Sequence, residues 1–407
     1  MSPADDVVIT GIGCRSPIGG DRETFWRRLL AGDSGVRSLN VADFHGLALP
    51  GDCNFPLIGA PADFTDGNGD AEPVVRLIDV AADESLSHAG LAAGDFDPTR
   101  GGCVIGTSKG GLVAFARSFA DRRGRTSSRN MWANIPPHVG STSVAARLNL
   151  LGPCLAPVAA CATGLVSVLR GCDLIRNDLC DVVLAGSGDA SLHPAVLASF
   201  RRMGVLSTHF ETPAAACRPF NIDRDGFVVG EGAAVFVLER RRNAMDRGAR
   251  PVATVIGGAV LSDPSGLTSV DPSGTTLSRA IRDTLLRTRR TVRDIGHINL
   301  HGTATRANDV AESNGLHAAF GQRIEDLHCV ALKGAIGHQL GAAGAVELVA
   351  TVLALRDGRL PPTVNLTAPD PECPLPLSSG TVSVRGCGLK ISLGFGGHVA
   401  IACLGPA

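Results

Sequence analysis

The sequence predicts a duplicated α/β fold, and three observations carry that prediction. The chain has 407 residues, more than a single small core needs, so two units are expected. Short β-branched runs alternate with helical patterns, which is typical of an α/β protein with buried strands. A repeat is also visible, because a helix leads into a strand ending in Gly-Thr at residues 106–107 and again at 302–303. Self-similarity of this kind predicts two related units with a site between them.

The period of the apolar residues predicts the individual elements. We expect strands at 7–10, 103–105, 182–184, 233–238, 252–260, 298–300 and 389–393. We expect helices at 72–89, 161–176, around 280–286, and at 341–355. In each half a turn of small residues opens a helix, at 160–164 and at 341–344, and this pair of turns strengthens the repeat.

Charge and hydropathy exclude several classes of protein. Lys and Arg number 38 against 39 Asp and Glu, so the basic excess of a nucleic-acid binder is missing. The apolar stretches are shorter than the roughly 18 residues that a membrane span requires. Residues 1–6 have neither the basic nor the apolar region of a secretory signal. We therefore expect a cytoplasmic protein that binds neither nucleic acid nor membrane.

The 12 cysteines are expected to be thiols, because disulfides are rare in a reducing compartment. No Cys-x-x-Cys pair supports a thiolate zinc site. Cys161 stands out because small residues surround it where a helix is predicted to begin. Backbone N–H groups and the positive helix end would favour its thiolate, and small neighbours would admit a thioester. A buried core cysteine is the equally weighted alternative.

Two histidines are further candidates for chemistry. His301 follows a predicted strand and precedes Gly302 and hydroxyl residues, a setting that suits a hydrogen-bond donor in a cleft, or a histidine that merely caps the strand. His297 would lie about 13 Å away along the strand, too far to share a metal, and is expected at the surface. His338 lies between Lys333 and Glu347, and these three predict a buried polar cluster.

Near the end of the chain, Phe395 lies in a glycine-rich turn at 394–397. Glycines on both sides would let this aromatic ring move, although an ordinary hairpin has the same pattern.

Taken together, these segments resemble the β-ketoacyl-[acyl-carrier-protein] synthases of the elongating branch of the thiolase superfamily. The resemblance covers nearly the whole chain, and its landmarks occur in the family's order. They are Ala160-Cys161, Arg218-Pro219-Phe220, Arg224-Asp225-Gly226-Phe227, Gly230-Glu231-Gly232, His301-Gly302-Thr303, Lys333 with Gly337-His338, and Gly394-Phe395-Gly396-Gly397. The resemblance implies a five-layered αβαβα thiolase-like fold, with a first half at 1–250 carrying the cysteine and a second at 251–407 carrying the histidines and lysine.

The resemblance also implies an activity, that of an acyltransferase (3-oxoacyl-[acyl-carrier-protein] synthase) in fatty-acid or polyketide-type synthesis. Cys161 would accept an acyl group, and His301 and His338 would bind the malonyl thioester and stabilise the enolate formed as carbon dioxide leaves. The N–H groups of Cys161 and Phe395 would hold the oxyanion. The other implied residues are Lys333 and Glu347 for electrostatic support, Asp309 and Glu312 around them, Thr303 and Thr305 for pantetheine, and Phe395 as a gate. Lys109 lies at the position of an acyl-pocket residue, and Met131 and Trp132 lie where the partner subunit often completes the pocket.

The pair of histidines separates this branch from initiating synthases, which pair the cysteine with His and Asn, and from thiolases, which pair it with His and a second Cys. No metal or cofactor is expected, because the substrate would arrive on the phosphopantetheine of a carrier protein. The sequence contains no Gly-x-Asp-Ser-Leu carrier motif, so the acyl carrier protein is expected in trans, with the chain itself a homodimer.

Several residues depart from the family pattern, and they are Gly334, Arg306, Asn308, His398, Val399 and Lys109. A charged Lys109 would be costly beside a long alkyl tail, so we expect a short, polar or specialised acyl substrate. Two alternatives stay open: a non-catalytic partner subunit akin to a chain-length factor, and an acyltransferase that does not decarboxylate.

Overall fold

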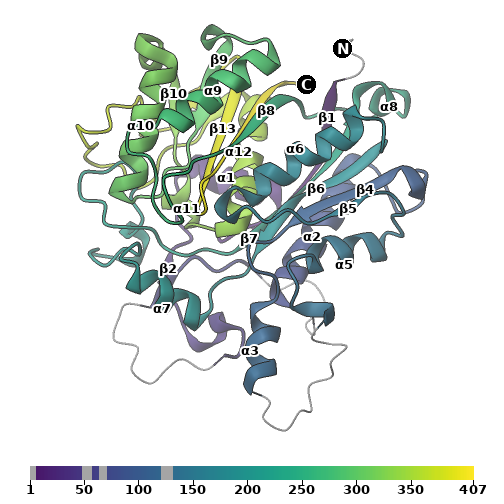
Figure 1. Cartoon of the computed structure of the whole chain (residues 1–407), viewed down its shortest axis with the longest axis horizontal. Helices are drawn as coiled ribbons and strands as arrows, with labels where there is room; N and C mark the ends of the chain where they lie inside the picture. The colour runs from purple at the N-terminus through teal and green to yellow at the C-terminus, as the bar shows by residue number, and fades with distance from the viewer. Residues whose placement is uncertain (1–5, 48–56, 64–70, 121–131) are drawn as a thin grey trace.

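The computed structural model describes residues 6–47, 57–63, 71–120 and 132–407, and a large sheet runs through them (Figure 1). The order of the ten strands in this sheet is β10-β9-β13-β14-β8-β1-β7-β6-β4-β5. Their bounds are β1 Val7–Arg15, β4 Gly101–Gly106, β5 Cys154–Leu155, β6 Val182–Asp189, β7 Gly232–Arg240, β8 Ala253–Ser262, β9 Ile295–Asn299, β10 His328–Val330, β13 Cys387–Gly394 and β14 His398–Pro406.

The two halves of the sheet repeat one topology. The order β5-β4-β6-β7-β1 in the first half matches β10-β9-β13-β14-β8 in the second. In each half the first three strands in this order run parallel, and the last two join antiparallel. The halves meet where β1 pairs antiparallel with β8, opposite Ala253–Val255. The predicted duplication is confirmed in the strand order.

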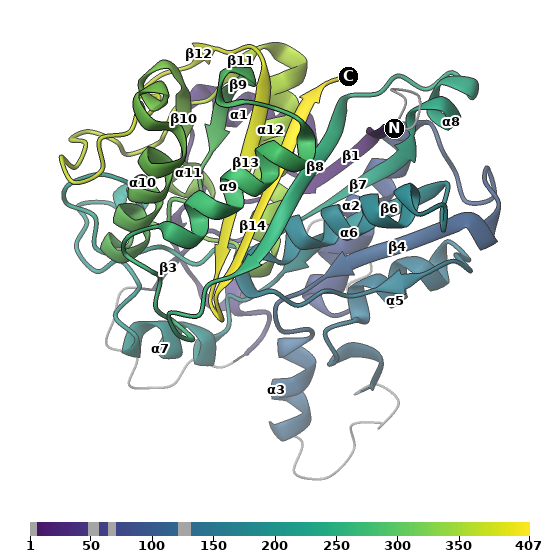
Figure 2. The same cartoon turned by 45° about the horizontal axis from the view of Figure 1, so that its top comes forward.

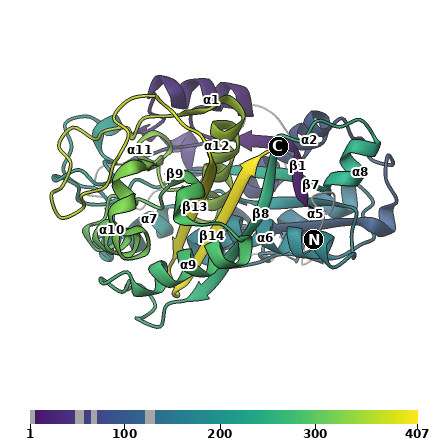
Figure 3. The ribbon, with the colours of Figure 1, turned by 90° about the horizontal axis from the view of Figure 1, so that it is seen from above.

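Helices complete five layers, as the resemblance implied (Figure 2). Helices α2 and α5 cover the outer face of the first half-sheet, and α9 packs on the outer face of the second with α10 against it. Helices α6 and α12 lie between the halves, because each contacts strands of both. Figure 3 shows α1 beside α12. These helices are α1 Arg22–Ala31, α2 Pro73–Ala89, α5 Val139–Arg147, α6 Thr163–Arg176, α9 Thr275–Thr288, α10 Arg306–Phe320 and α12 Ala343–Asp357.

Shorter elements connect these layers. The helices are α3 Leu112–Ala120, α7 Pro194–Arg202, α8 Arg241–Asp246 and α11 Lys333–Ile336. The 3₁₀ turns are η2 Val41–Phe44, η3 Pro98–Arg100, η4 Ala160–Ala162, η5 Pro213–Ala215, η6 Val292–Asp294, η7 Gly321–Asp326 and η8 Leu340–Ala342. The short strands are β2 Arg37–Ser38, β3 Ile58–Gly59, β11 Arg359–Leu360 and β12 Val382–Ser383. None of the helices in the described ranges is long and apolar enough to span a bilayer.

Small residues let the two central helices touch backbone to backbone. A Cβ at Gly164 on α6 would overlap the backbone nitrogen of Ala345 on α12, and a Cβ at Gly344 would lie 2.8 Å from the nitrogen of Leu165. The first turns of α6 and α12 are therefore fixed against each other. The predicted division at residue 250 stays a prediction, because the halves share one sheet.

Candidate active site

Cys161 lies in the 3₁₀ turn η4, directly before α6 begins at Thr163. The preceding Ala160 has φ 45°, a left-handed conformation that costs an L-residue on the order of 1–2 kcal/mol. Cys161 is 8% exposed, and it lines a cavity of about 160 Å³ together with His301 and His338. The structure thus brings together three side chains that the sequence identified separately.

The rings of His301 and His338 face each other almost edge to face, with centroids 5.4 Å apart and planes at 81°. His301 follows β9, and His338 follows α11. The backbone of His338 is tied to the neighbouring chain, because its N–H donates to the carbonyl of Val228 at 2.6 Å and its carbonyl accepts from Gly230 at 2.9 Å. Both imidazoles are almost fully buried.

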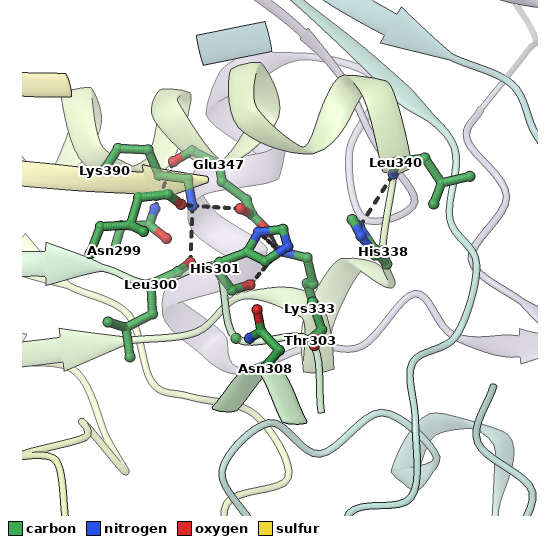
Figure 4. Close-up of polar contacts among 12 residues, drawn as sticks. Asn299, Leu300, His301, Thr303, Asn308, Lys333, His338, Leu340, Glu347 and Lys390 are labelled. Atoms are coloured by element: carbon green, nitrogen blue, oxygen red, sulfur yellow. Dashed lines mark hydrogen bonds and ion pairs between the residues drawn. The ribbon is translucent and has the colours of Figure 1, made fainter. Parts of the chain in front are cut away.

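Hydrogen bonds assign the proton on each ring (Figure 4). The backbone N–H of Leu340 donates to Nδ1 of His338 at 3.3 Å, and Nζ of Lys333 donates to Nδ1 of His301 at 3.4 Å. Each Nδ1 is therefore an acceptor, so each Nε2 carries the hydrogen. Burial, followed by the charge of Lys333, holds the pKa of both histidines well below its ordinary value. At neutral pH the pair are two uncharged Nε2–H donors.

A buried cluster of charges lies behind His301 (Figure 4). Nζ of Lys333 contacts Oε1 of Glu347 at 2.7 Å and donates to the carbonyl of His301. The other carboxylate oxygen, Oε2, lies 2.7 Å from Nζ of Lys390. The sequence prediction missed Lys390, although a lysine between Leu389 and Ile391 in a predicted strand was a usable signal.

Two carboxylates hold the chain around His301. Glu312 accepts from the N–H groups of His301 at 2.6 Å and Gly302 at 2.8 Å, and burial raises its pKa to about 7. Asp309 accepts from the N–H of Thr303 at 3.1 Å, and burial raises its pKa. Asp309 also pairs with Arg224 at 3.2 Å. Both predicted acidic residues therefore fix the backbone of the loop that carries His301.

Phe395 lies in the turn between β13 and β14 and lines the cavity at 36% exposure. Gly396 and Gly397 have φ 84° and 78°, which require glycine-like freedom. A Cβ at Gly394 would lie 3.1 Å from the backbone nitrogen of Cys161, so this turn approaches the cysteine closely. Thr303 and Thr305 also line the cavity, with their hydroxyls 2.8 Å apart.

The protonation state of Cys161 differs from the sequence-based expectation. Burial raises the pKa of its thiol to about 11, against the charges of Lys333 and Lys109 and the backbone N–H of Phe395, which lower it. The prediction of a stabilised thiolate is wrong, because loss of hydration outweighs the helix start in a site this enclosed. Cys161 is a thiol at neutral pH.

The residues predicted at the acyl pocket do not line the Cys161 cavity where the structure describes them. Lys109 is turned to a polar cluster, because its Nζ bonds Ser108 at 2.6 Å and Ser191 at 3.0 Å and pairs with Asp189 at 3.6 Å. Trp132 is 75% exposed and does not line the cavity of its own chain, so its role in a partner subunit's pocket stays a prediction. Met131 lies outside the described residues.

The expected surface position of His297 is wrong. This residue is fully buried in β9, which lies between β10 and β13 and is covered on both faces. A Cβ at Gly388 would lie 2.5 Å from its Nε2, and burial lowers its pKa to about 4. Within the described ranges, no three His, Cys, Asp or Glu side chains gather as a metal site.

A duplicated five-layer α/β fold, with a cysteine at a central helix start facing two histidines of the other half, defines the thiolase-fold class of condensing proteins. Two family descriptions match this chain: the beta-ketoacyl synthase N-terminal domain over residues 4–244 and the C-terminal domain over residues 252–367. The chain belongs to the β-ketoacyl synthase family, whose members are acyltransferases.

Individual relatives align with this chain over nearly its full length. The tetracenomycin polyketide synthase ketoacyl synthase alpha subunit of Streptomyces glaucescens is 35% identical, covering 98% of this chain and 96% of that protein. The 3-oxoacyl-[acyl-carrier-protein] synthase 2 of Synechocystis sp. is 31% identical, with 96% of both chains covered. A solved type II PKS acyl-carrier protein in complex with its ketosynthase bound to the hexaketide (AntDE:AntF) superimposes with a TM-score of 0.88 at 26% identity, over 99% of both chains.

Proposed function

We propose that this protein is a β-ketoacyl-[acyl-carrier-protein] synthase that performs a decarboxylative Claisen condensation on Cys161. One observation carries the proposal: a single cavity holds the Cys161 thiol and the Nε2–H donors of two neutral histidines. A thiol is the nucleophile that accepts an acyl group, and a pair of donors is suited to an enolate oxygen.

The first half-reaction transfers the acyl group. The Cys161 sulfur attacks the carbonyl carbon of an acyl thioester, and the N–H groups of Cys161 and Phe395 hold the oxyanion. The carbon–sulfur bond to the phosphopantetheine arm then breaks, and the departing thiolate takes the proton that Cys161 loses. The high pKa of Cys161 fits this order, because the thiol stays protonated until substrate arrives.

The second half-reaction removes carbon dioxide from a malonyl thioester. The bond to the carboxylate breaks, and its electron pair forms an enolate whose oxygen accepts from Nε2–H of His301 and His338. Each such donor stabilises a developing oxyanion by about 3 kcal/mol. The enolate carbon attacks the acyl group on Cys161, the carbon–sulfur bond breaks, and the released thiolate takes a proton from water.

The substrates would arrive on a separate acyl carrier protein, and no other cofactor is part of the proposal. The AntDE:AntF complex holds such a carrier protein against its ketosynthase, and its ketosynthase superimposes on this chain throughout. Thr303 and Thr305 line the cavity where a phosphopantetheine arm would pass. The cytoplasmic location and a fatty-acid or polyketide-type pathway belong to this same proposal.

We also propose a homodimer. Strand β5 is the last strand of the sheet, and the exposed apolar residues Leu151, Leu155 and Val158 lie on or beside it. Helix α3 projects from the body (Figure 2) and exposes Phe115 and Phe119. Light scattering during size-exclusion chromatography should give twice the monomer mass of 41.9 kDa.

Intact-protein mass spectrometry tests the function directly. Incubation with an acyl-carrier protein should add one acyl group to the chain, and addition of malonyl-carrier protein should release it as a β-ketoacyl product. Stable acylation without release would support a non-decarboxylating acyltransferase instead. Absence of acylation would support a partner subunit akin to a chain-length factor.

A further inference from the structure

Lys390 is a fully buried lysine in the middle of β13, next to Asn299 of β9 in the parallel register. Its Nζ donates to the carbonyls of Leu300 at 2.9 Å and Ile391 at 2.6 Å and lies 2.7 Å from Oε2 of Glu347 (Figure 4). An ammonium has three hydrogens, and three acceptors surround this one. A buried charge is tolerated only with such partners. The two carbonyls and the carboxylate of Glu347 therefore stabilise the ammonium of Lys390 inside the sheet.

Lys390 and Lys333 bind the two peptide units on either side of His301. Lys390 binds the carbonyl of Leu300, and Lys333 binds the carbonyl of His301. On the other side, the carboxylate of Glu312 binds the N–H groups of His301 and Gly302. Buried charged groups from β13, α11 and α10 therefore hold the peptide units on both sides of His301.

Glu347 couples the two lysines electrostatically. Its two carboxylate oxygens face Lys333 and Lys390, each at 2.7 Å. Two ammonium groups thus share one carboxylate behind His301. Positive charge at this distance disfavours a protonated imidazole, and Lys390 lowers the pKa of both His301 and His338, after burial and Lys333.

We propose that Lys390 is a positioning residue for the decarboxylation step, because its ammonium fixes the Leu300–His301 peptide and so aims the Nε2–H of His301 at the substrate oxygen. The inference rests on the proposed function of the same cavity and adds a residue that neither the sequence prediction nor the family resemblance assigned. Acyl transfer to Cys161 uses the N–H groups of Cys161 and Phe395, so it does not depend on this contact.

The test compares the two half-reactions in Lys390→Met, which keeps an unbranched side chain one atom shorter and removes the charge. Acylation of Cys161, followed by intact mass, should stay within about twofold of the wild type. Release of labelled carbon dioxide from malonyl-carrier protein should fall about tenfold to a hundredfold, since misplacing a reacting group by about 1 Å has effects of that size. Nuclear magnetic resonance of labelled histidine should show the pKa of His301 moving upward.

A second variant covers the case in which Lys390→Met fails to fold. Lys390→Gln keeps a polar group that can donate a hydrogen bond to the carbonyl of Leu300 and leaves the Lys333–Glu347 pair intact, so it should fold where Lys390→Met does not. If Lys390 has only a structural role, both half-reactions fall together in the variant that folds, or decarboxylation stays at the rate of the wild type. Either result overturns the inference, and so does an unchanged His301 titration. A wild type that releases no carbon dioxide would instead refute the proposed function itself.

Discussion

The turns that open α6 and α12 have the same backbone but different roles. Each is a 3₁₀ turn of three residues that leads into a central helix, and its first residue is in the left-handed region, Ala160 at φ 45° and Leu340 at φ 47°. The second residue is Cys161 in one turn and Gly341 in the other. A Cβ at Gly341 would lie 2.7 Å from the nitrogen of Ser108, so only the first turn has room for a functional side chain.

This difference shows that equivalent turns in the two halves of a duplicated fold can have different functional roles. The first copy of the turn presents a thiol to the cavity. The second is packed against Asp189, which accepts from the N–H of Gly341 at 3.0 Å, while the N–H of Leu340 orients His338. The turn in the first half therefore presents the nucleophile, and the corresponding turn in the second half orients a histidine.

Removing the Cys161 side chain, which distinguishes the first turn from the second, should have the largest effect on activity. Cys161→Ala should abolish acylation and reduce condensation at least about a thousandfold, because the nucleophile is lost. Cys172→Ala is the matched control, since Cys172 is buried like Cys161 but lies on α6 and does not line the cavity. Acylation that persists in Cys161→Ala, measured by intact mass, would contradict the assignment.

The contact between the two helix starts should be the next most sensitive feature. Gly164→Ala would drive a Cβ into the backbone nitrogen of Ala345 and should lower the free energy of unfolding by about 3 kcal/mol. Gly344→Ala, where the corresponding distance is 2.8 Å, should cost about 1–2 kcal/mol. Denaturant titration should rank them in this order.

Gly380→Ala serves as the control for that pair, because no atom lies within 4 Å of the place that its Cβ would occupy. Its free energy of unfolding should change by less than about 0.5 kcal/mol. Equal changes in the free energy of unfolding for Gly164→Ala and Gly344→Ala would show that α6 and α12 are packed symmetrically at this contact.

The histidine oriented by the second turn should make stability depend on pH. The pKa of His338 is held well below 6.5 in the folded protein, so below pH 6.5 the unfolded chain binds a proton that the folded protein does not. Stability is then lost as pH falls, by up to about 1.4 kcal/mol per pH unit for this group. His338→Gln should flatten this slope in denaturant titrations between pH 5 and 8, and an unchanged slope would exclude a neutral buried imidazole.

The smallest effect is expected at Lys109, on the polar cluster beside Gly341. Lys109→Ile removes the ion pair with Asp189, whose carboxylate keeps its bond from Gly341. Because Lys109 is turned to this cluster and does not line the Cys161 cavity, turnover of long saturated acyl groups relative to short ones should change by less than about twofold. Rates with a series of acyl-carrier substrates provide the measurement, and a larger shift toward long acyl groups would show that Lys109 takes part in substrate selection.

The sequence predicted the strands and helices that are defined by a local pattern of apolar residues. Strands β1, β7 and β8 and helices α2, α6 and α12 lie where the β-branched runs and helical periods indicated, although α6 and α12 begin two residues late because a 3₁₀ turn precedes each. The strand at 398–406 was not predicted, since its small residues carry little β-branched signal.

The features that could not be predicted depend on burial. The pKa of Cys161, the buried position of His297 and the partners of Lys109 all follow from which residues surround each side chain after folding. Cys161, His301 and His338 do share one cavity, as predicted, while their chemical roles stay predictions until tested.

The uncharged state of the two Nε2–H donors bears on inhibitor design. A small molecule that places a carbonyl oxygen between them would be held by neutral hydrogen bonds in an enclosed cavity, without pairing of opposite charges. Added salt weakens contacts between exposed charges but leaves neutral ones nearly unaffected. The affinity of such a compound should therefore hardly vary with ionic strength.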